Sequence, residues 1–511
     1  GGMYLWNSNS ILTNITIENN TSNYRGGGMF LWNSGSILTN ITIDNNTSND
    51  DGGGMYLTGF WGILTNITIA NNTAWTYGGG MYMYNADFTL SNVTFSGNTA
   101  GTVGGGMYLV ESSSPTLTNS ILWGNLPDEI YYAGYDNPSS ITITYSDIQG
   151  GQESIATNDN GTVTWGDGNI DVDPKFIDAE NDDYHLRASS QCINGGDPTT
   201  FDSDGSRADM GANPYLNTYS GPTWYISESG NDATATGASD DPFRSIQAGI
   251  NFSSNTDSVT VAAGTYVENI NFRDRNIKVV GEDRETTTID GNGQSSVVIF
   301  KDYHVGDYEN GDDSLDDVLL KGFTIKNGAG TYVWAGENGE LRFGGGILCE
   351  FSSPTLEELI IEENIVDATG YGSAVCLREF SSPMMKNIII RNNSLGGNSV
   401  GSALYVTGYS SPTIDNFEII DNPGFSQHNH SLILISGVSK SVLKNGIIRG
   451  NNGDISFSDR DTVLVQSVEI SGNDGSWGDY FIGIDTSRVT FDRCTIIDNN
   501  HGNGIKMNYH S

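Results

Sequence analysis

A repeat of 26 residues limits the possible folds of this chain more than any other feature of its sequence. The tetrapeptide Gly-Gly-Gly-Met begins at Gly26, Gly52, Gly78 and Gly104, always 26 residues apart. An aromatic residue follows each methionine, and a second β-branched segment such as residues 38–43 comes later in the copy. Short alternating segments without a helical period predict β-strands. Each repeat is therefore expected to form one unit of a repeating β architecture.

The length of the repeat distinguishes between the known repeat folds. Leucine-rich repeats need a Leu-x-x-Leu-x-Leu pattern that this chain lacks, and a propeller blade needs about 40 residues. In the second half, Ser-Ser-Pro triplets begin at Ser352, Ser381 and Ser410, which gives a period of 29. We therefore predict an all-β chain whose repeats are coils of right-handed parallel β-helices (solenoids), stacked about 4.8 Å apart.

Stacking in register would place every residue above its copy in the neighbouring coil. One predicted interior column contains Met3, Met29, Met55, Met81 and Met107. Two columns of asparagine are predicted to form side-chain amide ladders. The first contains Asn14, Asn40, Asn66, Asn92 and Asn119, and the second contains Asn20, Asn46, Asn72, Asn98 and Asn125. The second column continues in the second half at Asn364, Asn393, Asn422, Asn451, Asn473 and Asn499.

The aromatic residues come directly after the methionines, and successive side chains of a strand point to opposite faces. We therefore expect these aromatic residues to form a stripe on the outer face. This predicted surface for a ligand or partner contains Tyr4, Phe30, Tyr56, Tyr82 and Tyr108, with Trp6 and Trp32 two residues further on. Such a row can hold sugar rings, be covered by a neighbouring chain, or stack on itself. The sequence leaves these three readings open, so glycans and copies of the chain are both candidate partners.

Changes in the repeat divide the chain. Residues 1–215 are predicted to form a first β-helix with an irregular acidic end, residues 216–223 a linker, and residues 224–511 a second β-helix. The pair Asp241-Pro242 is a good helix start. Phe243, Ile246 and Ile250 fall on one helical face. We expect a short α-helix here that caps the open edge of the second β-helix.

The motifs near these boundaries resemble known families. The acidic stretch from Asp202 to Ala212 is similar to the end of many bacterial secreted right-handed β-helix proteins, including those with a choice-of-anchor terminal region. The coils before it resemble polymorphic outer-membrane protein repeats, and residues 224–511 resemble the pectate-lyase-like superfamily. The resemblance implies an extracellular or cell-surface location in a bacterium. It implies no particular activity, because many unrelated activities occur on this fold.

The formal charge of −39 repels nucleic acid and attracts cations. Asp202, Asp204 and Asp209 surround Gly205 in the pattern of an oxygen-ligand calcium site, so Ca²⁺ is the one cofactor that the sequence suggests. No glutamate follows at the EF-hand distance, and the alternative reading is an acidic turn without metal. The acidic residues 307–317 and the pair at 428 and 430 are weaker metal candidates.

Catalytic motifs do not stand out. A polysaccharide lyase needs a basic residue, and a glycoside hydrolase needs grouped carboxylates. Arg25 is the only basic residue before Pro174. We therefore predict a non-catalytic scaffold or adhesin. The alternatives are a lyase or hydrolase acting on acidic polysaccharide, which a groove lined by Arg378 and Arg391 would support, and a self-assembling fibre subunit.

Two further expectations concern the whole chain. Its apolar runs are all shorter than the roughly 18 residues that a membrane span needs, so no span is predicted in this segment. The sequence begins at Gly1 within a repeat, and we expect it to be a segment of a longer protein. Four cysteines are too few for a disulfide framework.

Overall fold

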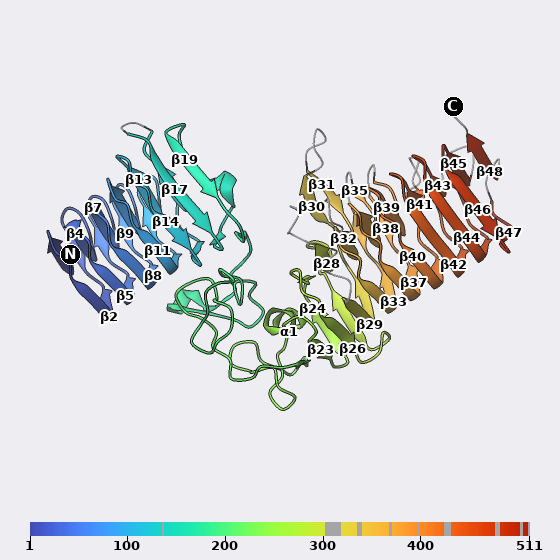
Figure 1. The fold of residues 1–511 in the computed structure, drawn as a ribbon, viewed down its shortest axis with the longest axis horizontal. Helices are drawn as coiled ribbons and strands as arrows, with labels where there is room; N and C mark the ends of the chain where they lie inside the picture. The colour runs from blue at the N-terminus through green and yellow to red at the C-terminus, as the bar shows by residue number, and fades with distance from the viewer. Residues whose placement is uncertain are drawn as a thin grey trace. The chain divides into compact units, whose positions relative to one another are not determined.

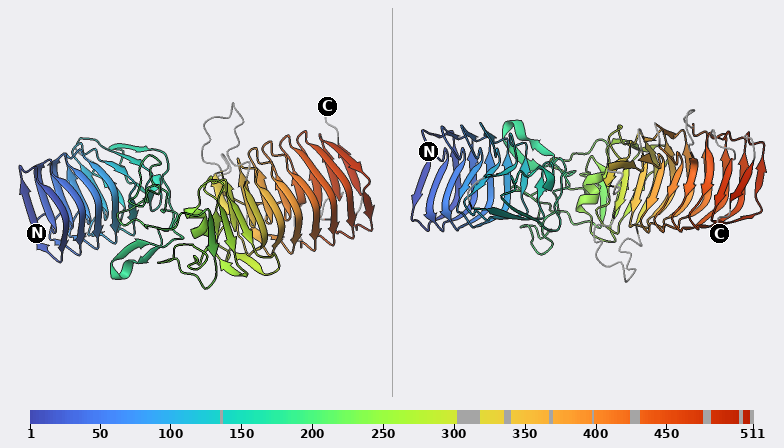
Figure 2. Two further views of the ribbon diagram at one scale, coloured as in Figure 1. Left: turned by 60° about the horizontal axis from the view of Figure 1, so that its bottom comes forward. Right: turned by 90° about the horizontal axis from the view of Figure 1, so that it is seen from above.

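The computed structural model describes residues 1–511 except 135–136, 302–317, 335–339, 367–369, 397–398, 424–430, 476–480, 501–503 and 509–511. It forms two compact units, Gly1–Thr218 (unit 1) and Tyr219–Ser511 (unit 2). Each unit contains a stack of coils whose strands pair in parallel with the next coil (Figures 1 and 2). The predicted all-β parallel solenoid is confirmed.

Three parallel sheets build the coils of unit 1. The first contains β1 (Met3–Trp6), β4 (Met29–Ser34), β7 (Met55–Phe60), β10 (Met81–Tyr84), β13 (Met107–Val110) and β16 (Ile130–Tyr132). The second contains β2 (Ile11–Glu18), β5 (Ile37–Asp44), β8 (Ile63–Ala70), β11 (Thr89–Ser96), β14 (Thr116–Thr118), β15 (Ile121–Trp123), β17 (Ser139–Thr144), β18 (Asp147–Ile148) and β19 (Gly161–Trp165). The third contains β3 (Thr21–Ser22), β6 (Thr47–Ser48), β9 (Thr73–Ala74) and β12 (Thr99–Ala100). An antiparallel pair, β20 (Phe176–Asp178) and β21 (Asp183–Leu186), follows the coils.

Unit 2 repeats this scheme. Its largest sheet contains β22 (Thr223–Ile226), β23 (Ser258–Val261), β24 (Gly264–Val267), β26 (Lys278–Gly281), β27 (Thr287–Asp290), β29 (Leu319–Lys326), β33 (Thr355–Glu362), β37 (Met384–Arg391), β40 (Thr413–Ile420), β42 (Lys440–Arg449), β44 (Thr462–Ser471), β46 (Arg488–Asp492) and β47 (Thr495–Ile497). The next contains β25 (Ile270–Asn271), β28 (Val298–Lys301), β32 (Ile347–Glu350), β36 (Val375–Arg378), β39 (Leu404–Val406), β41 (Ser431–Ile435), β43 (Asp454–Phe457), β45 (Ile482–Asp485) and β48 (Ile505–Asn508). Two small sheets contain β30 (Thr331–Trp334), β31 (Glu340–Phe343) and β35 (Gly370–Tyr371), and β34 (Ile365–Val366) with β38 (Ser394–Leu395).

The methionine column lies inside unit 1 as predicted. Met3 pairs with Met29, and the register continues without a shift through Met55, Met81 and Met107. The last four side chains are completely buried. Because successive strand residues point to opposite faces, the same register sends the aromatic residues to the outer side of this sheet.

The second asparagine column forms a buried amide ladder in both units. Asn46 Nδ2 donates to Asn72 Oδ1, and Asn72 Nδ2 donates to Asn98 Oδ1, each over 3.0 Å. Every rung also anchors the chain, since Asn72 Nδ2 donates to the carbonyl of Ile43 at 2.8 Å. In unit 2 the ladder runs through Asn364, Asn393, Asn422, Asn451, Asn473 and Asn499. The predicted ladder of the second column is confirmed. The first column forms a ladder only from Asn14 through Asn40 to Asn66, whereas Asn92 and Asn119 bond to residues 197–209 instead.

One α-helix, α1 (Ile246–Phe252), lies at the start of unit 2, and all its residues are buried. The expected start at Asp241-Pro242 is wrong by several residues. Phe243 instead forms an isolated parallel bridge beside β22, where its N–H donates to the carbonyl of Tyr225 at 3.0 Å. The helix begins after Ser245, whose side chain accepts from the N–H of Ala248. Within the described residues, no helix is both long and apolar enough to cross a lipid bilayer.

Candidate functional site: an open groove on unit 2

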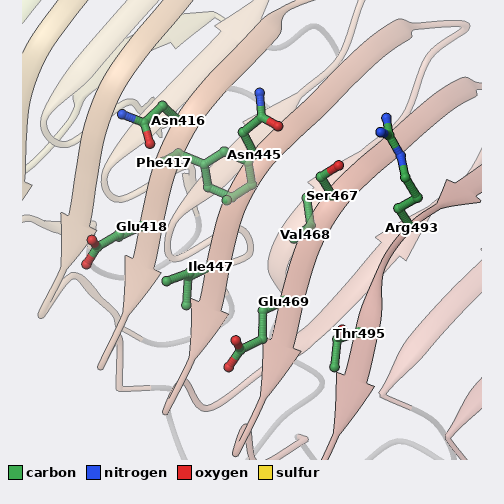
Figure 3. Close-up of a pocket in the computed structure, with 11 residues that line it drawn as sticks. Asn416, Phe417, Glu418, Asn445, Ile447, Ser467, Val468, Glu469, Arg493 and Thr495 are labelled. Atoms are coloured by element: carbon green, nitrogen blue, oxygen red, sulfur yellow. The ribbon is translucent and has the colours of Figure 1, made fainter.

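A groove runs across successive coils on the outer side of the largest sheet of unit 2. It consists of two adjoining cavities of about 420 and 370 Å³, which share Asn416, Phe417 and Glu418. The first cavity is also lined by Asp283, Arg284, Glu358, Asn387, Ile388 and Ile389. The second, shown in Figure 3, is also lined by Asn445, Gly446, Ile447, Ser467, Val468, Glu469, Arg493 and Thr495.

The groove follows a bend that recurs in each coil. Asn387, Asn416 and Asn445 occupy the left-handed region with φ of 55–57°, a conformation that asparagine tolerates better than most residues. The chain runs as a strand on both sides of this bend. Phe417 comes next and is buried beneath the groove. Its ring reaches under the next coil, where a Cβ on Gly446 would lie only 2.3 Å from Phe417 Cε1.

Two of the carboxylates that line the groove stand in one row, one on each side of Ile447. Glu418 pairs in register with Ile447, which pairs with Glu469, so the two glutamates lie two coils apart. At the usual strand spacing their Cα atoms are about 9.6 Å apart. Figure 3 shows both carboxylates in the same row. Both side chains are exposed, and Ser471 Oγ donates to Glu469 Oε1 at 2.7 Å.

The basic residues of the groove already have partners. Arg284 Nη1 donates to the carbonyl of Asn387 at 3.0 Å, and its Nε lies 3.8 Å from Glu285. Arg493 Nε lies 3.4 Å from Asp492. Among the described residues, the ion pairs do not include Glu418 or Glu469. The groove therefore presents uncompensated negative charge, which favours a neutral or cationic ligand over a polyanion.

In the later coils of unit 1 the corresponding face is covered by the chain itself. Residues 192–213, here called the return segment, fold back over the bends of the earlier coils. The N–H of Gly211 donates to the carbonyl of Asn119 at 2.8 Å, and the N–H of Ala212 donates to Thr94 Oγ1 at 2.9 Å. Asn119 Nδ2 donates to Thr200 Oγ1 at 3.1 Å. The sequence marked this segment as irregular, but no local signal showed which surface it covers.

The predicted calcium residues stabilise the return segment through backbone hydrogen bonds. Asp209 is fully buried and accepts from the N–H groups of Asn194 and Tyr215, each at 2.7 Å. Asp202 Oδ2 accepts from the N–H of Asp209 at 2.8 Å, and Asp204 accepts from the N–H of Ser206 at 3.0 Å. Burial raises the pKa of Asp209 to about 8, so this side chain keeps its proton at neutral pH.

These aspartates do not come together as a set of metal ligands. In the described part of the chain, no group of three or more His, Cys, Asp and Glu side chains could hold a metal ion. Calcium binding at this loop stays a prediction. The acidic residues at 307–317 and the histidines at 428 and 430 lie outside the described residues.

The aromatic stripe lies on the outer face of the first sheet, but it is not an open surface. Tyr56, Tyr82 and Tyr108 are only 3%, 9% and 2% exposed. The guanidinium of Arg25 lies 4.9 Å from the centre of the Tyr56 ring, and Tyr77 stacks on Tyr108 at 4.7 Å. The alternation of side chains along a strand predicts on which side of the sheet a ring lies. It cannot predict that a turn covers the ring.

Stacking between coils also occupies the faces of these rings. Phe30 and Tyr56 stack at 5.0 Å, and Tyr56 and Tyr82 stack at 4.7 Å. Of the other members, Phe30 and Trp32 are partly buried, whereas Tyr4 and Trp6 are 60% and 53% exposed. The contacts therefore favour self-stacking over a platform for sugar rings.

The two arginines proposed for a catalytic groove lie in different sheets. Arg378 is on β36, with its Nε 3.7 Å from Glu350 Oε1 and its guanidinium 4.5 Å from the centre of the Phe343 ring. Arg391 is on β37, with its Nε 2.6 Å from Glu362. Neither residue lines the groove. All four cysteines are free thiols.

Comparison with known proteins places this fold in a family. The family model described as right handed beta helix region matches residues 52–187 and 386–511, just over half of the chain. The chain belongs to the right-handed β-helix family. Among curated proteins, no sequence matches this right-handed β-helix protein.

Solved structures show only a distant similarity to this right-handed β-helix protein. A pectin methylesterase from carrot is 13% identical, with a TM-score of 0.33, and the match covers 58% of this chain and 91% of the esterase. The pectin methylesterase from Aspergillus niger in deglycosylated form is 14% identical, with a TM-score of 0.27. That match covers 56% of this chain and 87% of the esterase. Scores this low carry no argument about activity.

Proposed function

We propose that this β-helix protein is a non-catalytic scaffold or adhesin at the bacterial cell surface or outside the cell, and that the groove of unit 2 binds an extended glycan. The observation that supports this most directly is the continuous groove from Arg284 to Arg493. Its length follows the stacking of the coils, so similar polar groups recur along it at the strand spacing. A ligand with its own repeat fits such a surface.

The chemistry of the groove suits sugar rings. The bend asparagines supply amide donors and acceptors, and Ile447 provides an apolar position between two carboxylates. Concave sites that combine apolar side chains with a few placed polar groups are typical of small-molecule binding. The free carboxylates of Glu418 and Glu469 would repel a polyuronate. We therefore propose a neutral or amino-sugar polymer as the ligand.

Calorimetric titration of the full chain would test this function. Hexasaccharides of N-acetylglucosamine, glucosamine and galacturonic acid serve as probes. We expect binding of one or both of the first two and none of the third. Replacing both Glu418 and Glu469 with alanine should weaken binding at least 10-fold. The Glu340→Ala variant changes an exposed carboxylate outside the groove and is the control. Absence of binding to any probe, or equal loss in the control, would contradict the proposal.

A glycoside hydrolase is the second candidate, because Glu418 and Glu469 stand on the same face of the groove two coils apart. Inverting hydrolases place their two carboxyl groups about 6.5–9.5 Å apart. The Cα atoms of Glu418 and Glu469 are about 9.6 Å apart, so side chains that lean toward each other would bring the two carboxyl groups into that range. Release of reducing ends from a polysaccharide, abolished by Glu418→Gln or Glu469→Gln, would establish hydrolysis and replace the non-catalytic proposal.

The remaining parts of the proposal concern assembly. The two units are proposed to be tandem β-helices, with α1 capping the first coils of unit 2. Contacts that support the cap come from Glu268, whose carboxylate accepts from the N–H groups of Ile246 and Gln247 at 2.8 and 3.0 Å. Self-assembly into fibres stays a prediction, and electron micrographs that show only single short rods would contradict it.

A further inference from the structure

The coils of the two units bend in the same way. Asn92 and Asn119 of unit 1 have φ of 54° and 50°, close to the values at Asn416 and Asn445 in the groove of unit 2. Thr94 follows its bend by two residues, as Glu418 does in unit 2. The face that forms the groove in unit 2 therefore has a structural equivalent in unit 1.

In unit 1 the exposure of this face changes along the stack. Thr16 and Thr42, two residues after the bends of the first coils, are exposed. The equivalent Thr68 and Thr94 are only 7% and 1% exposed. This change coincides with the contacts of the return segment, which reaches as far as Thr68 through Asn213 Nδ2 at 3.5 Å.

The return segment uses the polar groups that a ligand of this face would use. The side-chain oxygen of Asn119 accepts from the N–H of Asp197 at 2.7 Å, while its backbone carbonyl accepts from Gly211. Asn92 Nδ2 donates to the carbonyl of Asp209 at 3.4 Å. In unit 2 the described contacts of this kind come from Arg284, whose guanidinium donates to the carbonyl of Asn387 and whose own carbonyl accepts from Thr324 Oγ1 at 2.7 Å.

We propose that unit 1 carries a second glycan-binding face and that the return segment closes this face by occupying it in cis. The inference depends on the proposed function of the groove on unit 2, because that groove supplies the ligand class. A chain with the return segment in place therefore has one binding site, and a chain with the segment displaced has two.

A pair of glycine substitutions tests this closure without changing the face itself. A Cβ on Gly211 would lie 2.8 Å from Ile121 Cδ1 and 3.0 Å from Thr94 Oγ1, so Gly211→Leu should push the segment away. Gly205 lies in the same segment with a similar φ, +88° against +95°, and a Cβ there would meet nothing within 4 Å. Gly205→Leu is therefore the matched control for backbone strain.

Two measurements on the full chain decide the outcome. Hydrogen exchange should rise at least 10-fold in residues 192–213 of the Gly211→Leu variant while the coils stay protected. Titration with the hexasaccharide that binds the original chain should then give two sites per chain, against one for the original chain and the control. Ala212→Pro, which removes the N–H bonded to Thr94 Oγ1, provides a second route to the same result.

Several results would overturn the inference. A displaced return segment with still one binding site would show that the uncovered face of unit 1 does not bind the glycan. A return segment that stays protected in both variants would show that it belongs to the structural core. Absence of binding to the original chain would contradict the proposed function of unit 2 instead, so the two failures are distinguishable.

Discussion

Buried carboxyl groups should make the stability of unit 1 depend on pH, and two aspartates are the most strongly shifted of them. Asp147 is buried, and its carboxylate accepts from the N–H of Val172 at 3.1 Å and from Cys192 Sγ at 3.2 Å. Burial raises the pKa of Asp147 to about 8, and it has the same effect on Asp209. The ordinary pKa of an aspartate, 3.8, applies in the unfolded chain. Between pH 3.8 and about pH 8, the folded chain therefore keeps protons that the unfolded chain releases.

The free energy of unfolding of unit 1 should therefore fall by several kcal/mol as pH rises from 4 to 8. The stabilisation is fully present below pH 4 and is lost above about pH 8. Denaturant unfolding followed at several pH values measures this slope. Asp147→Asn imitates the protonated side chain, so we expect it to reduce the slope. A slope of opposite sign, or no change in the variant, would contradict this assignment.

Sequence alone predicted part of this residue-level picture. The positions of the asparagine rungs follow from the repeat, because identical residues recur at one spacing. The role of Asp209 does not follow from the repeat. Its partners are the N–H groups of Asn194 and Tyr215, and these contacts depend on how an irregular segment folds. A row of acidic residues looks the same in sequence whether it binds a cation or backbone amides.

At the scale of the strand and ladder, the buried amides should contribute much more stability than the exposed ones. Asn72→Ala removes the partners of Asn46, Asn98 and the Ile43 carbonyl inside the core. Each unsatisfied buried group costs about 1–3 kcal/mol, so we expect a loss of about 3 kcal/mol or more. Chemical denaturation of the two purified variants, Asn72→Ala and the control below, measures the difference.

The matched control is Asn66→Gly. Asn66 Nδ2 donates to Asn40 Oδ1 at 3.0 Å on the exposed ladder, and glycine retains the left-handed backbone at this bend. We expect a loss below about 1 kcal/mol. Equal losses in both variants would show that the buried ladder has no special stabilising role.

The elements also show where sequence reasoning works. Strand register followed directly from the 26-residue period, and the Met29–Met55–Met81 column confirmed it. The groove on unit 2 could not be found this way, because the residues two positions after the bends differ between coils, as Ile389, Glu418, Ile447 and Glu469 do. Helix α1 was expected, but its start depended on the strand-like pairing of Phe243 with Tyr225, a contact between segments distant in sequence.

At the scale of the whole molecule, none of the sheets formed by the described residues contains strands of both units. Each unit has its own ladder and its own apolar interior, so we expect two separate unfolding transitions in scanning calorimetry. As pH rises from 4 to 8, the transition of unit 1 should move further to lower temperature than that of unit 2, because burial raises the pKa of Asp147 and Asp209 in unit 1 to about 8 but that of Asp461 in unit 2 only to about 6. A single transition at every pH would show that the units unfold together.

The unbroken register of the first coils has a consequence for how such a chain can change. Adjacent copies are so alike that unequal recombination between their coding sequences would add or remove one complete repeat. Each product would still place methionine on methionine and asparagine on asparagine. Length can therefore vary during evolution in steps of one coil, while the interior chemistry of every remaining coil is conserved.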